Sequence, residues 1–479
     1  MGESLKATAT RGVLWSAVNK FATQFMQFGI GIVLARLLLP SDFGLIGMLS
    51  IFIAISSTFI DSGMNSGLIQ KQQRTDVDFS TVFVFNLVIS AAFYLLLFIS
   101  APLIASFFNQ PTLVPLTRVL GLNLIINAVA IVQRSKLTIA IDFKSLAIVQ
   151  IVGVFVGGGV GLIVAFYGFG VWSLVIQTLL GALASTITLW YMSKWTPSLT
   201  FSKDSFKRLF GYGSKLLLAG LYAQAFHNIY NISIGKSYPA AELGYYTRTK
   251  NFADMTSGTI ANILKQVTFP ILAGLQDDKE RMVSIYRKLI RMTSFFVFPV
   301  MVLLAILAEP IVMLLLTKKW ATVIPLLQWM AFARLFYPIS GINMNILNAV
   351  GRSDLFLKVD LSKAPLIIIA LVITIPLGVK AVVIGHVVVA TIAFFINAYL
   401  PGKYFGYGAI EQLKDMLPIF FMTIVMAIPT FMVIQVFDNY YVQIALGCTV
   451  AFMVYGILSY LLKMEELKEL KTLIYKFKK

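Results

Sequence analysis

Seven basic side chains lie inside the long apolar stretches of this sequence, where ionisable groups are costly and therefore point to function. They are Lys20, Arg118, Lys215, Arg248, Lys250, Lys265 and Arg334, whereas the acids in these stretches are Asp61, Asp254 and Glu309. A guanidinium group can grip a phosphate or carboxylate through two hydrogen bonds, and an ammonium group binds as a point charge. The excess of positive charge favours an anionic substrate.

Position along each stretch separates the basic candidates. Lys20 and Arg334 are the deepest and, together with Arg248, are the cations expected to bind the substrate. Arg118 and Lys215 lie within about two turns of an expected helix end, so snorkelling to the interface explains them, and it stays open for Arg248.

The three acids are candidates for coupling transport to an ion. Asp254 follows Lys250 by four residues, so the two side chains can also neutralise each other on one helix face. Asp61 and Glu309 have no such neighbour in sequence, and nothing in the pattern ranks one of the three acids above the others.

Two expected helices carry matching stripes of polar side chains with helical spacing. The first stripe is Lys20, Gln24 and Gln27, and the second is Gln224, His227 or Asn228, and Asn231. We expect both stripes to line a cavity and bind hydroxyl groups, and the alternative is that they hold the helices together through interhelical hydrogen bonds. His227 is either a proton-coupling group, since histidine titrates near neutral pH, or a structural side chain.

The composition requires a membrane. Hydrophobic residues make up 58% of the 479 residues, charged residues make up 13%, and the mean hydropathy is +0.84. A soluble fold cannot bury that much apolar surface. Lipid leaves only helices or a closed barrel, because backbone polar groups must be satisfied internally. Unbroken apolar runs such as 366–377 and 416–437 lack the alternation of barrel strands, so the sequence predicts an all-α polytopic membrane protein.

About fourteen transmembrane helices are expected. They cover residues 12–39, 43–63, 79–108, 116–140, 146–167, 170–193, 211–236, 243–275, 289–317, 322–349, 364–378, 379–400, 417–437 and 440–462. The domains that follow are an N-terminal six-helix bundle (1–193), a cytoplasmic linker (194–210), a C-terminal six-helix bundle (211–400), two extra helices (401–462) and a basic cytoplasmic tail (463–479).

The distribution of positive charge orients these helices. Of the 39 lysines and arginines, 27 fall on the side of the N-terminus and five on the other side. The positive-inside rule therefore places both termini in the cytoplasm and explains the net charge of +18 without nucleic acid. The basic tail is expected to lie on anionic lipid, with docking of a protein partner as the alternative.

An internal repeat appears when the sequence is shifted by 200 positions. The matching pairs are Gln24 with Gln224, Arg36 with Lys236, Asp42 with Glu242, and Gly44 with Gly244. Helices six spans apart point the same way, so the two halves form a parallel repeat. Transporters of this kind bind substrate between their halves and alternate access by rocking.

These motifs resemble a known family. The run from Leu34 to Gly44 (LARLLLPSDFG) is similar to the start of polysaccharide exporters, the oligosaccharide flippases of the multidrug/oligosaccharidyl-lipid/polysaccharide exporter superfamily. The run from Glu242 to Tyr246 with Arg248, the segment 269–272 and the turn 351–354 also fit. The resemblance spans nearly the whole chain.

The resemblance implies a transporter rather than an enzyme. It would move a polyprenyl-diphosphate-linked oligosaccharide to the outer leaflet of a bacterial inner membrane, for surface polysaccharides such as O-antigen or capsule. The implied partners are this substrate and membrane lipids, with other polysaccharide-assembly proteins as further candidates. No cofactor is implied.

Other functions remain as alternatives. A cation-coupled multidrug exporter of the same superfamily would need an acidic cavity, and a membrane glycosyltransferase or polymerase would need a large outer loop. Export of a peptidoglycan precursor would differ only in the sugar. ATP binding is not supported, because Tyr230 stands where a P-loop ending at Ser237 needs glycine, and two histidines cannot form an HExxH zinc site.

Overall fold

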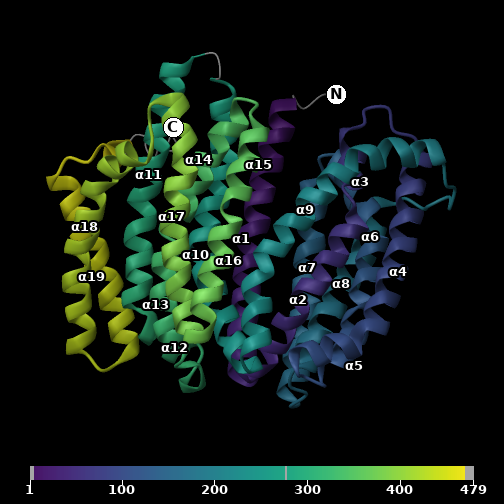
Figure 1. Cartoon of the computed structure of the whole chain (residues 1–479), viewed down its shortest axis with the longest axis horizontal. Coiled ribbons are helices and arrows are strands. Elements are labelled where there is room, and N and C mark those ends of the chain that lie inside the picture. The colour runs from purple at the N-terminus through teal and green to yellow at the C-terminus, as the bar shows by residue number, and fades with distance from the viewer. Residues whose placement is uncertain (1–4, 276–277, 470–479) are drawn as a thin grey trace. The chain divides into compact units, whose positions relative to one another are not determined.

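The computed structural model describes residues 5–275 and 278–469. Within these ranges the regular secondary structure is helical and contains no strand, which confirms the all-α prediction. Nine helical stretches in the described part are long and apolar enough to cross a membrane, so the number fourteen stays a prediction. The chain packs into two compact units, Met1–Gly244 and Tyr245–Lys479, whose helices are labelled in Figure 1.

The first unit contains the helices expected in the N-terminal half, together with α9 (Lys203–Ser237), which was expected to begin the second bundle. They are α1 (Leu5–Leu37), α2 (Pro40–Asp61), α3 (Met64–Gln70), α4 (Asp76–Phe108), α5 (Leu113–Leu120), α6 (Leu122–Ile139), α7 (Phe143–Phe166), α8 (Trp172–Ser193) and α9 (Lys203–Ser237). The break after α2 falls at Ser62 and Gly63, which have φ of 45° and 67°. Left-handed residues end helices because they leave the helical backbone conformation.

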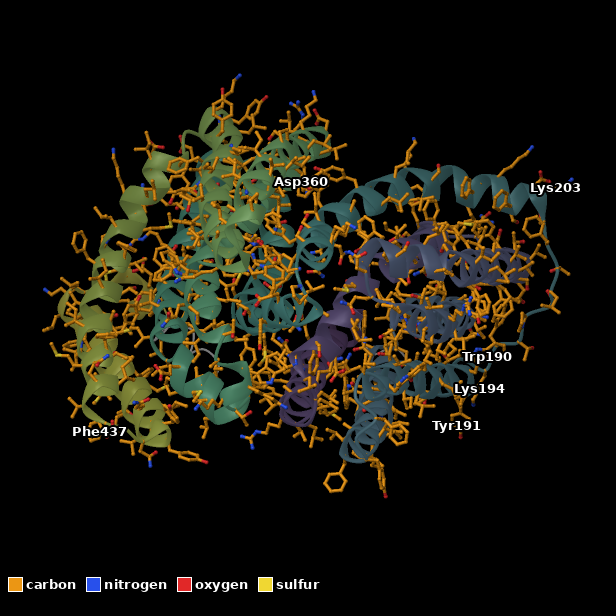
Figure 2. The ribbon with its side chains drawn as sticks, turned by 60° about the horizontal axis from the view of Figure 1, so that its bottom comes forward. Trp190, Tyr191, Lys194, Lys203, Asp360 and Phe437 are labelled. Atoms are coloured by element: carbon orange, nitrogen blue, oxygen red, sulfur yellow. The ribbon has the colours of Figure 1, made fainter. Side chains whose placement is uncertain are left out.

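The helix α9 begins inside the stretch 194–210 that was expected to be a linker. The connection without helical structure runs from Lys194 to Ser202, and Figure 2 shows it between the labelled residues Lys194 and Lys203. The hydroxyl of Ser80 lies 2.9 Å from that of Ser198, which ties this connection to α4.

Packing places α9 with the first unit. It contacts α2, α3 and α4, and Gly213 lies so close to Gly63 that a Cβ on either glycine would meet the other backbone within 3 Å. The repeat had assigned this helix to the second bundle. Repeat ancestry and packing therefore divide the chain at different points, near residue 200 and at residue 244.

The starts of α2 and α10 (Ala240–Ala273) cross at two glycines. A Cβ on Gly44 would lie closer than 3 Å to the carbonyl oxygen of Ala240, and one on Gly244 would lie equally close to that of Pro40. A shift of 200 positions relates Pro40 to Ala240 and Gly44 to Gly244, so the contact is reciprocal. The repeat read from the sequence thus appears as a backbone-to-backbone contact between its two copies.

The second unit contains most of α10 and the helices that follow. They are α11 (Lys279–Ile306), α12 (Ala308–Leu315), α13 (Val323–Ala333), α14 (Tyr337–Ala349), α15 (Ser353–Ser362), α16 (Ala364–Thr374), α17 (Val379–Phe405), α18 (Ala409–Val436) and α19 (Tyr440–Leu461), with short 3-10 turns at Lys318–Trp320 and Ile375–Leu377. The expected break between 364–378 and 379–400 is present at Gly378, whose φ is 104°. The side chains of Lys265 and of residues 269–271 lie outside the described part.

The predicted turn at 351–354 carries an ion pair on the surface. Both oxygens of Asp354 accept hydrogen bonds from the guanidinium of Arg352, at 3.0 and 3.1 Å. These hydrogen bonds lower the pKa of the Asp354 carboxyl, because they stabilise its charged form.

A closed ring of hydrogen bonds joins α11, α14 and α18 in the core of the second unit. The hydroxyl of Tyr286 donates to Asn343 at 2.6 Å, the Asn343 amide donates to Gln412 at 3.1 Å, and the Gln412 amide donates back to Tyr286 at 2.9 Å. All three side chains are fully buried. The Gln412 amide also donates to the carbonyl oxygen of Tyr407 at 3.3 Å, so the Tyr286 hydroxyl and the Asn343 amide are the members that depend on the ring.

We expect Tyr286→Phe to destabilise the protein by about 1–3 kcal/mol, because it leaves a buried acceptor on Asn343 unsatisfied and removes one of the two acceptors of the Gln412 amide. Thermal unfolding of the purified protein in detergent measures the change. Tyr441→Phe is the matched control, because Tyr441 is 69% exposed and should leave stability unchanged. Equal melting temperatures for the two variants would contradict the ring.

Acidic residues after α19 bind to α11. Arg291 pairs with Glu465 at 3.0 Å and with Glu466 at 2.7 Å, and Lys288 pairs with Glu469 at 2.6 Å. The tail expected at 463–479 is described only to residue 469, and the rest of it lies outside the described residues. Its described part is therefore held to the second unit through its acids.

Candidate functional site

The polar stripe of α1 reaches a pocket inside the first unit. Lys20 and Gln24 are partly accessible, and Gln27 is exposed and lines a cavity of about 410 Å³. The walls of this cavity are α1, α6, α7 and α8. Gln27 is thus a stripe residue that lines a cavity of the first unit.

The stripe of α9 is used differently along its length. Asn228 and Asn231 are buried, and both contact the hydroxyl of Ser50 on α2, at 3.3 and 3.4 Å. The carbonyl of Gln224 accepts from the Asn228 amide at 3.0 Å, and His227 is exposed. Asn228 and Asn231 thus form hydrogen bonds between α9 and α2, which is the alternative to lining a cavity. His227 has an accessible side chain.

Close packing of α7 on α8 shapes the first cavity. A Cβ on Gly157 would meet the backbone of Gly181 and Gln177 within 3 Å, and one on Gly153 would meet the Ser185 hydroxyl. Because the two backbones touch, the amides of Gln150 on α7 and Gln177 on α8 both line the same cavity.

Arg134 is the charged residue among the described residues that line this cavity. It lies on α6 and is exposed, and its guanidinium makes no hydrogen bond or ion pair with any described residue. Asp61 at the end of α2 acts on Arg134 electrostatically. The coupling candidate Asp61 is therefore a neighbour of an arginine that the sequence analysis had counted with the cytoplasmic charges.

A second pocket, of about 380 Å³, lies inside the second unit and is lined by Arg334. The Nε of Arg334 donates to Asp254 at 2.6 Å, and its Nη1 lies 3.3 Å from the Nε2 of His386 on α17. Since arginine can only donate, His386 accepts through Nε2 and is neutral in this arrangement. Arg334 and Asp254, a predicted binding residue and a predicted coupling residue, are thus brought together.

Lys250 acts electrostatically on both Asp254 and Arg334. Lys250 and Asp254 were expected to pair along one helix. In the structure, Asp254 forms its close ion pair with Arg334 instead, and Lys250 acts on it electrostatically. Asn397 of the same pocket is 3% exposed and its Oδ1 accepts no hydrogen bond from a described residue.

The other predicted residues lie elsewhere. The guanidinium carbon of Arg248 is 5.9 Å from the ring centre of Trp320, a cation–π contact. Glu309 is exposed in the first turn of α12, so it lies outside both pockets.

Sequence reasoning missed two residues of these pockets. Arg134 precedes Arg334 by 200 positions, so the repeat itself relates the two arginines and was the available signal. His386 belongs to no motif, and its contact with Arg334 comes from α17 packing on α13.

The helices and their internal polar pockets define a multi-pass membrane protein with a transporter fold. The solved structure of the lipid II flippase MurJ in an inward closed conformation superposes with a TM-score of 0.79 at 15% identity, over 94% of this chain and 98% of that one. An inward-facing multidrug resistance MATE family transporter of the MOP superfamily superposes with a TM-score of 0.63 at 16% identity, over 82% of this chain and 98% of its own.

Residues 33–325 match the family described as polysaccharide biosynthesis protein, and the chain belongs to this family. The lipopolysaccharide biosynthesis protein WzxC of Escherichia coli K12 is 25% identical over 77% of this chain and 76% of its own length. The teichuronic acid biosynthesis protein TuaB of Bacillus subtilis 168 is 23% identical over 72% of each chain. These matches confirm the resemblance that the motifs indicated.

Proposed function

We propose that this protein is a flippase that moves a polyprenyl-diphosphate-linked oligosaccharide from the cytoplasmic to the outer leaflet of a bacterial inner membrane. The observation that carries the proposal is the family match over residues 33–325. The named relatives, which act in the biosynthesis of lipopolysaccharide and teichuronic acid, support a surface glycan as the cargo.

The charges along the chain support an anionic cargo. Basic side chains within the apolar stretches outnumber acidic ones, and Asp254 forms an ion pair with Arg334. Lys20, Arg248 and Arg334 are the cations proposed to meet the diphosphate, and Gln24, Gln27, Gln224, His227 and Asn231 are the proposed partners of sugar hydroxyls. A cation-coupled drug exporter would instead need unpaired acids for its substrate.

The orientation with both termini in the cytoplasm is part of the proposal, and it rests on the excess of basic residues on that side. Transport would proceed by alternating access, with the prenyl chain remaining in lipid and no covalent change in the substrate. Asp61, Asp254 and Glu309 are the proposed candidates for ion coupling, and other polysaccharide-assembly proteins are proposed partners.

Sided labelling of the lipid-linked oligosaccharide in cells depleted of the protein tests the proposal. We expect the diphosphate-linked sugar to accumulate on the cytoplasmic leaflet, and the wild-type gene to restore its export. Lys20→Gln and Arg248→Gln should each restore export more slowly than the wild type at equal protein level. If depleted cells still deliver the sugar to the outer leaflet but leave it unpolymerised, the protein is a polymerase and the flippase proposal is wrong.

A further inference from the structure

The two pockets each contain an arginine, and the two arginines occupy corresponding positions in the two repeats. Arg134 on α6 and Arg334 at the end of α13 are 200 positions apart, the same shift that relates Gly44 to Gly244. Each arginine lines a cavity of similar size, about 410 Å³ in the first unit and about 380 Å³ in the second. Each also has an acid from a corresponding helix nearby, Asp61 from α2 and Asp254 from α10.

The two arginines differ in what they bind. The guanidinium of Arg334 is 2.6 Å from Asp254, so it already has an acidic partner within the protein. Arg134 has no ion pair or side-chain hydrogen bond with a described residue, although it is surrounded by polar groups in a cavity. The guanidinium of Arg134 therefore keeps all of its donors for a ligand, whereas that of Arg334 already uses two of its five donors on Asp254 and His386.

The rest of the first cavity is suited to hydroxyl groups. Its described lining contains Gln27, Gln150, Gln177 and Asn127, and no acid. The side-chain amides of Gln27 and Gln177 make no hydrogen bond with any described residue. An amide offers both donors and an acceptor, as a sugar hydroxyl requires. A volume of about 410 Å³ is within the range of small-ligand pockets.

We propose that the cavity of the first unit binds a sugar residue that carries an anionic group, with the carboxylate or phosphate on Arg134 and the hydroxyls on Gln27, Gln150 and Gln177. This rests on the proposed function, since it names the part of the glycan that is recognised. A planar guanidinium takes either anion through two hydrogen bonds, so the arms of the experiment separate carboxylate from phosphate.

Cysteine protection tests the proposal without transport. Cys448 is the one cysteine of the chain and lies outside the cavity, so Cys448→Ser with Ala182→Cys gives a single thiol in the pocket and keeps the proposed binding residues. The full-length protein in nanodiscs is labelled with a maleimide in the presence of glucuronate, glucose 1-phosphate or glucose. We expect at least one of the two anionic sugars to slow labelling about fivefold more than glucose at equal concentration.

Arg134→Gln in the same background should abolish the advantage of the anionic sugar and keep the weak protection by glucose. Arg118→Gln is the control, because Arg118 lies over the ring of Phe98 and does not line the cavity. Equal protection by all three sugars, or an anionic advantage that survives Arg134→Gln, would overturn the proposal. Loss of protection together with intact flipping in cells refutes this site alone, whereas intact protection without flipping refutes the proposed function alone.

Discussion

Gly44→Ala and Gly244→Ala should each prevent the first unit from assembling. A Cβ at either position meets a backbone carbonyl of the other repeat within 3 Å, and backbone cannot move aside as a flexible side chain can. We expect a cost of about 3 kcal/mol or more, at or above the upper end of overpacking penalties. Little folded protein should be recovered from membranes, as measured by size-exclusion chromatography of a fluorescent fusion.

Other glycines supply the control for this effect. Gly258 lies on the same helix as Gly244, and a Cβ there meets nothing within 4 Å. Gly258→Ala should be neutral or stabilising, because alanine is favoured over glycine inside a helix by about 1 kcal/mol. Of the two substitutions on α10, only Gly244→Ala should thus lower the recovery of folded protein. Equal recovery of Gly244→Ala and Gly258→Ala would show that the two helix starts do not touch.

Asp254→Asn should be the most damaging single change of charge in the second unit. Arg334 is 9% exposed in its side chain, and the substitution leaves its guanidinium beside the neutral His386 and the basic Lys250. Loss of one partner of a buried ion pair costs about 3–5 kcal/mol, and the lower value applies because Asp254 is partly accessible. The melting temperature in detergent should fall by roughly 6–10 °C.

Removing the other partner of the ion pair, Arg334, should destabilise the protein less. Arg334→Gln leaves the carboxylate of Asp254, whose side chain is 37% exposed and can be hydrated. The double variant Asp254→Asn with Arg334→Gln should recover part of the loss, because it removes the stranded charge. If Asp254→Asn and Arg334→Gln are equally harmful and additive, the ion pair does not account for their effects.

Hydropathy predicted the membrane-crossing stretches because lipid selects apolar residues over the whole length of a span. It could not predict the breaks within several of them. Leu120 to Leu122 and Ile306 to Ala308 are apolar across the point where one helix ends and the next begins. A break between two helices within one turn leaves the average hydropathy unchanged. Such a break is therefore visible only in the folded structure.

The candidate site was predictable where a polar side chain within an apolar stretch of the sequence was itself the signal. Gln27 and Arg334 were found in this way, and both line pockets. Arg134 was counted with the cytoplasmic charges because it lies near the end of an expected helix. The contacts of Arg334 with Asp254 and His386 join residues from three helices that are far apart in the sequence. Local spacing in the sequence cannot predict such contacts.

The reciprocal crossing of Gly44 and Gly244 also sets the order in which the protein can be made. The glycine face of α2 finds its partner only after Ala240 has been synthesised, roughly 200 residues later. At ribosomal speeds of about 5–20 residues per second, that is a delay of about 10–40 s. During this interval the membrane holds an unfinished first unit, so its completion is coupled to the insertion of α10.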